Sequence, residues 1–92
     1  MNEKRVHVIV VGDVQGVGFR MSCQRRAITL GVRGWVRNRW DGSVEALFEG
    51  EAAAVDALVE WCRHGSPAPY VERVEVKAEP LGLPEKGFRV RL

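Results

Sequence analysis

A strand, a glycine-containing loop and a helix follow one another near the start of the sequence, and this unit restricts the possible folds most. Val6–Val11 is a run of β-branched residues broken only by His7, which is typical of a buried strand. Gly12–Gly18 contains three glycines and predicts a loop. Apolar residues then recur at spacings of four, four and three, as on one face of a helix: Phe19, Cys23, Ala27 and Leu30. Gly31 predicts the end of that helix.

Four further strand-like segments follow, at residues 32–39, 43–49, 74–78 and 88–92. Asp41-Gly42 is a turn signal, which joins the first two of these segments as a hairpin. We expect a second helix to begin at Gly50, with Glu51 in its first turn, and to end at Gly65-Ser66-Pro67. Residues at positions i, i+3, i+4 and i+7 indicate its buried face: Val55, Leu58, Val59 and Cys62.

The resulting order of elements is βαββαβ followed by one more strand. It predicts an α+β, ferredoxin-like sandwich, in which an antiparallel sheet carries two helices on one face and a short extra strand at the C-terminus. With 92 residues, we expect one domain over 1–92. Such a fold supports many functions, so the function has to be argued from particular residues.

The composition narrows the range of partners. The formal net charge is +2 and no basic run exceeds two residues, which disfavours nucleic-acid binding but suits a small anionic substrate. No apolar run approaches the ~20 residues of a membrane span, and Met1–Arg5 is polar, so we expect a cytoplasmic protein that binds no membrane. Cys23 and Cys62 lack metal-ligand spacing, and we expect two reduced, partly buried thiols.

The loop that precedes the first helix has two interpretations. A helix start offers unpaired N–H groups that glycines can turn toward an anion, but the same glycines also suit a plain tight turn. Arg20 lies at the positive end of the helix dipole, where a cation is unfavourable. Asp13 could neutralise this charge, or a bound phosphate could, because a guanidinium matches two phosphate oxygens. Asn38, just before the hairpin turn, is either a local turn residue or a partner for an attacking water.

The sequence resembles the acylphosphatase family along nearly its whole length. The matching segments are Gly12–Arg20, Gly34–Asn38, Asp41–Ala46, Phe48–Gly50 and Gly65–Pro67. The resemblance implies an enzyme that hydrolyses the bond between a carboxyl group and phosphate in small acyl phosphates, and that releases inorganic phosphate.

The resemblance also implies roles for individual residues. Arg20 would bind the phosphate and Asn38 would position the nucleophilic water. The N–H groups of the loop would form a cradle for the phosphate, contributed by Gln15, Gly16, Val17, Gly18 and Phe19. We expect no metal and no cofactor, and a monomer. We expect no catalytic role for His7 or His64, which lie outside these segments, and partial exposure of Trp40.

Two alternatives stay open. The first is a module that only binds phosphate, like the related domain of larger carbamoyl-transferring maturation proteins; it would need Arg20 but not Asn38. The second is RNA binding, because RNA-recognition modules share the βαββαβ order. Residues 43–49, where such modules carry a basic and aromatic segment, are acidic here, which disfavours this alternative.

Overall fold

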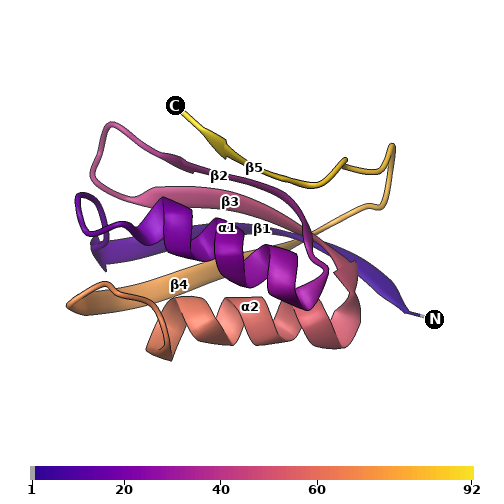
Figure 1. Ribbon diagram of the computed structural model, residues 1–92, viewed down its shortest axis with the longest axis horizontal. Coiled ribbons are helices and arrows are strands. Elements are labelled where there is room, and N and C mark those ends of the chain that lie inside the picture. The colour runs from indigo at the N-terminus through magenta and orange to yellow at the C-terminus, as the bar shows by residue number, and fades with distance from the viewer. Residues whose placement is uncertain (1) are drawn as a thin grey trace.

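The computed structural model describes residues 2–92, which form a five-stranded sheet with two helices packed on one of its faces (Figure 1). The elements follow in the order β1 (Glu3–Asp13), α1 (Phe19–Leu30), β2 (Arg33–Asn38), β3 (Val44–Glu51), α2 (Ala52–His64), β4 (Tyr70–Glu79) and β5 (Phe88–Arg91). The expected α+β fold, including the extra C-terminal strand, is confirmed. Neither helix is long and apolar enough to cross a membrane.

The sheet has the strand order β4-β1-β3-β2-β5 and is mixed. The neighbouring pairs β4–β1, β1–β3 and β3–β2 are antiparallel, as expected, whereas β5 runs parallel to β2. The reason is geometrical. The end of β4 and the start of β2 lie at the same end of the sheet, so the connection over residues 80–87 crosses that end and enters β5 in the direction of β2.

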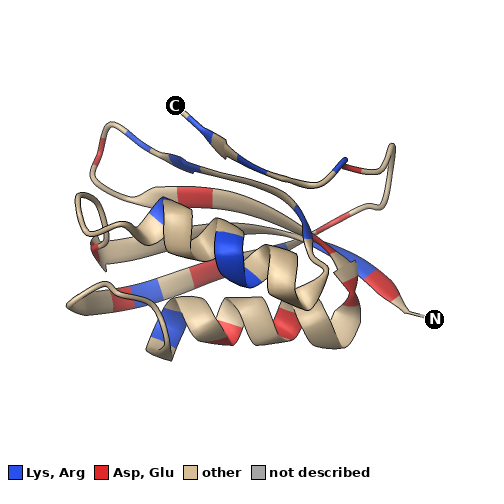
Figure 2. Cartoon of the chain, viewed as in Figure 1, with Lys and Arg blue, Asp and Glu red and all other residues tan. Residues whose placement is uncertain are grey.

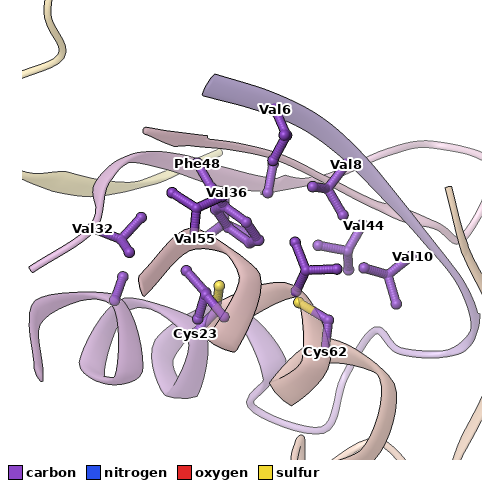
Figure 3. Close-up of a cluster of buried hydrophobic side chains, with 14 of the residues drawn as sticks. Val6, Val8, Val10, Cys23, Val32, Val36, Val44, Phe48, Val55 and Cys62 are labelled. Carbon is purple, nitrogen blue, oxygen red and sulfur yellow. The ribbon is translucent and has the colours of Figure 1, made fainter. Parts of the chain in front are cut away.

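The hydrophobic core lies between the sheet and the helices (Figure 3). Val6, Val8 and Val10 of β1 are buried, in agreement with the alternation of the strand. The expected face of α2, with Val55, Leu58, Val59 and Cys62, is also buried. Cys23 lies beside Cys62, and both thiols are free and fully buried rather than partly buried.

The start of α2 differs from the prediction. The helix begins at Ala52, and Gly50 and Glu51 still belong to β3, where they pair with Lys4 and Glu3. The Ala52 N–H then donates to the carbonyl of Asn2 at 2.8 Å. Pairing with β1 thus extends β3 through the residues whose composition favoured a helix start.

The other face of the sheet is polar. Glu49 on β3 is 1% exposed and accepts hydrogen bonds from Arg5 at 3.1 Å and from Arg33 at 3.2 Å. It also accepts the main-chain N–H of Glu85 at 3.0 Å. This buried carboxylate therefore attaches the connection between β4 and β5 to the sheet.

Candidate active site

The loop between β1 and α1 ends in a helix start that no side chain caps. Gly18 occupies the N-cap position with φ 77°, in the left-handed region that favours glycine, and Gly16 has φ 76°. The first turn of α1 contains no acidic residue. The N–H groups of this turn are therefore available to an external anion, which the helix dipole also favours.

The helix start is fixed in position by Phe19. This residue is 2% exposed, and its ring lies 5.4 Å from the ring of Trp61 on α2, measured between centroids, at an interplanar angle of 50°. Burial and ring packing hold the first residue of α1 against the second helix. The loop therefore has a rigid support directly behind it.

The register of the sheet brings Asn38 to the same place. Val10 of β1 pairs with Val44 of β3, and Val44 pairs with Asn38 at the end of β2. Asn38 and the residues that follow Val10 thus share one end of the sheet, although they are distant in sequence. A hairpin joins β2 to β3 at this end (Figure 1).

A cavity of about 110 Å³ unites the loop, the helix start and the strand end. Its lining residues are Val14, Gly16, Gly18, Phe19, Arg20, Met21 and Asn38. Among the predicted site residues, Gln15 and Val17 are not part of this lining. Larger hollows exist elsewhere on the surface, but this one combines a guanidinium, a carboxamide and an uncapped helix start.

Arg20 is oriented by main chain rather than by a carboxylate. Its Nη1 atom donates to the carbonyl of Arg91 at 3.0 Å. Within residues 2–92 it forms no ion pair, so the neutralisation by Asp13 that the sequence allowed does not occur. The charge of Arg20 therefore remains available at the cavity.

Gln15 connects the loop to the hairpin. Its Nε2 atom donates to the carbonyl of Arg39 at 2.6 Å and to the carbonyl of Ser43 at 2.9 Å. Both acceptors flank the turn that follows Asn38. The side chain of Gln15 thus fixes the loop and Asn38 relative to each other, a contact for which the sequence held no signal.

The hairpin turn is stabilised by Asp41. Its Oδ1 atom accepts the hydroxyl of Ser43 at 2.6 Å and the N–H of Ser43 at 3.0 Å. These hydrogen bonds lower the pKa of the Asp41 carboxyl, because they favour its ionised form. Next to it, Trp40 is 98% exposed, which exceeds the partial exposure expected for it.

A cluster of titratable side chains around Glu45 lies outside this cavity. On the polar face of the sheet, Glu45 accepts hydrogen bonds from His7 at 2.6 Å and from Arg37. Burial alone would raise the pKa of Glu45, but these two hydrogen bonds and the charges of Arg37 and His7 together outweigh it, and the pKa is lowered. Within residues 2–92, no group of three or more His, Cys, Asp or Glu side chains is arranged to hold a metal ion.

Sequence reasoning missed Val14 and Met21 as lining residues and the Arg91 carbonyl as the acceptor for Arg20. Val14 and Met21 flank the predicted segment directly, so an extension by one residue at each end would have included them. The contact with Arg91 depends on the parallel placement of β5, which no local pattern indicated.

Known proteins are similar to this chain over most of its length. A family model described as Acylphosphatase matches residues 6–90. A protein of Rubrobacter xylanophilus named acylphosphatase is 60% identical over 88 residues, which cover 96% of this chain and 80% of that protein. The structure of an acylphosphatase from Coxiella burnetii has a TM-score of 0.90 and 37% identity, with 98% of this chain and 94% of that chain covered. The crystal structure of acylphosphatase from Bacillus subtilis has a TM-score of 0.90 and 38% identity, over 96% of this chain and 98% of that chain.

Proposed function

Because the chain belongs to the acylphosphatase family and is a hydrolase that acts on acyl phosphates, we propose that it does so by direct attack of one water molecule on the phosphorus atom. The observation that carries this proposal is the cavity that Arg20 and Asn38 line together. The products are a carboxylate and inorganic phosphate.

The phosphoryl group binds at the start of α1. Arg20 directs its donors to two phosphate oxygens, and main-chain N–H groups from Gln15 to Phe19 donate to the others. The uncapped helix start and its two left-handed glycines support this cradle. The donors stabilise the charge that develops on the equatorial oxygens in the transition state, and they need little reorganisation to do so.

Asn38 positions the nucleophile. A carboxamide both accepts and donates hydrogen bonds, so it can hold a water molecule with a lone pair directed at phosphorus. The contacts of Gln15 with Arg39 and Ser43 keep this strand end at a fixed place relative to the loop. The gain in reaction rate is mainly entropic, because the water and the phosphoryl group are held in line before the reaction.

The chemistry needs no further group. The leaving group is a carboxylate, which departs without a strong general acid, and a phosphate oxygen of the substrate takes up the proton of the attacking water. Arg20 and the N–H groups supply the charge stabilisation that a metal ion supplies in other phosphoryl transfers, so we propose that the reaction is metal-independent.

We further propose that residues 1–92 act as one domain and as a monomer in the cytoplasm. The two free thiols fit a reducing compartment. Nucleic acid is not a proposed partner, because Glu45 and Glu49 place carboxylates on the sheet strand that RNA-recognition modules use for binding.

The test is hydrolysis of benzoyl phosphate in ¹⁸O-labelled water, with and without a chelator. Attack at phosphorus places the label in inorganic phosphate, and the rate is the same in the presence of chelator. Label in benzoate would mean attack at the acyl carbon, and loss of activity with chelator would mean a required metal ion. Binding of phosphate without turnover would support a module that only binds.

A further inference from the structure

A second hollow, of about 440 Å³, lies between α1 and the end of α2. One of its walls is a polar face of α1, formed by residues at positions i, i+3, i+4 and i+7: Ser22, Arg25, Arg26 and Thr29. The opposite wall consists of Trp61, Gly65 and Pro67. None of these lining residues carries a carboxylate. The hollow is therefore positively charged, with hydroxyl groups and a flat aromatic surface.

The two arginines of this hollow have no carboxylate partner within residues 2–92. Among residues 2–92, seven of the eleven arginines pair with carboxylates: Arg5, Arg33, Arg37, Arg39, Arg63, Arg73 and Arg89. Within residues 2–92, Arg25 and Arg26 are not among them, and α1 has no acidic residue of its own (Figure 2). In the part of the chain that the structure describes, Arg20 at the proposed phosphate site likewise has no carboxylate partner. Both guanidinium groups are therefore free to bind an external anion.

The size of the hollow indicates an organic anion. It is four times as large as the cavity at Arg20, and it falls in the range of about 300–1,000 Å³ that is usual for small-molecule sites. A neighbouring hollow of about 500 Å³ adjoins it and shares Arg26, Trp61 and Gly65. Its wall includes Leu30 and Ala57, and its one carboxylate, on Glu60, faces His64 at 3.4 Å. A ligand can therefore place its charge at the arginines and an apolar ring against Trp61.

The ring of Trp61 is held in place by a buried aromatic residue. It packs against Phe19 at 5.4 Å between centroids, and Phe19 is buried. A fixed indole offers a stacking surface without loss of side-chain entropy on binding. We propose that this hollow is a second anion site, which binds a phosphate monoester that carries an aromatic ring, such as a nucleoside monophosphate. This proposal does not depend on the hydrolytic mechanism.

Binding can be measured by NMR with adenosine 5′-monophosphate as the probe. The full chain is ¹⁵N-labelled and carries Arg20→Ala, which removes phosphate binding at the other cavity. The indole N–H signal of Trp61 is identified by its loss in Trp61→Phe. We expect a saturable shift of this signal with adenosine 5′-monophosphate, and at least tenfold weaker binding of adenosine and of inorganic phosphate.

A double variant, Arg25→Gln with Arg26→Gln, tests the two arginines in the same background. It should weaken binding at least tenfold, while Arg63→Gln, an exposed control on α2, should change it less than twofold. Circular dichroism and thermal unfolding verify that each variant is folded. An unshifted Trp61 signal, full binding by the double variant, equal binding of inorganic phosphate, or an equal loss in Arg63→Gln would overturn the proposal.

Discussion

The Nη1 atom of Arg20 lies 3.0 Å from the main-chain carbonyl oxygen of Arg91 and donates a hydrogen bond to it. The contact joins the first turn of α1 to the end of β5, 71 residues later. Because a guanidinium is planar with five donors in fixed directions, one bonded donor sets the direction of the others. β5 therefore orients Arg20, although it contributes no side chain to the cavity.

The side chain of Arg91 should support this arrangement. Its guanidinium lies 4.8 Å from the ring centroid of Trp35 on β2, a cation–π contact worth about 0.5–1 kcal/mol at an exposed site. Arg91→Ala keeps the carbonyl but loses this contact, so kcat/KM for benzoyl phosphate should fall about two- to fivefold. Arg89→Ala, an exposed control on the same strand, should leave it unchanged. Equal kinetics of both variants would show that the stacked side chain does not position Arg20.

Arg20→Lys tests the guanidinium itself. An ammonium group cannot bond two phosphate oxygens in a fixed plane, and it also loses the defined contact with the Arg91 carbonyl. We expect kcat/KM to fall about 100-fold or more. Arg63→Lys, an exposed exchange on α2, is the control and should retain wild-type hydrolysis. Near-normal turnover by Arg20→Lys would contradict the proposal that the guanidinium binds two phosphate oxygens.

Glu45 should make stability depend on pH in the acid range. The pKa of this carboxyl is lower in the folded protein than in the unfolded chain, so its ionised form stabilises the fold above pH about 4.3, and this contribution is lost as the pH falls through the folded pKa. Glu45→Gln should therefore be less stable than wild type at pH 7, and its stability should decline less steeply below pH about 4.3. Urea unfolding at several pH values measures the stability at pH 7 and its decline at lower pH. If the stabilities of wild type and Glu45→Gln declined in parallel, Glu45 would not contribute to the pH dependence.

Cys23 and Cys62 should be protected in the native state. Contact with Cys62, together with burial, raises the pKa of the Cys23 thiol, and neither residue is exposed. Because the thiolate is the reactive form, modification by a disulfide reagent must wait for opening of the core. We expect it to be on the order of 1,000-fold slower than in the urea-unfolded chain. Rapid labelling of the native protein would contradict this burial.

Local patterns predicted the elements that depend on local chemistry. Both ends of α1 were predicted, because the apolar spacing from Phe19 to Leu30 and the left-handed Gly31 act within a few residues. The start of α2 was not predicted, because Gly50 and Glu51 are held in β3 by pairing with β1. Long-range pairing here outweighed a composition that suits a helix start.

The candidate site was predictable to a similar extent. Arg20 and Asn38 could be selected from their places in the sequence and from the family resemblance, and the fold brings them to one cavity. The bonds of Gln15 to the hairpin and of Arg20 to Arg91 could not be predicted, because each joins residues whose distance depends on the assembled sheet. The contact between Cys23 and Cys62 is of the same kind.

The most direct test of the mechanism is steady-state hydrolysis of benzoyl phosphate by wild type and Asn38→Ala, each with inorganic phosphate as inhibitor. If Asn38 holds the water and Arg20 holds the phosphate, the variant should lose kcat at least 100-fold while phosphate inhibits both proteins competitively with the same inhibition constant. An unchanged kcat, or a loss of phosphate affinity as large as the loss of kcat, would contradict the division of roles between these two residues.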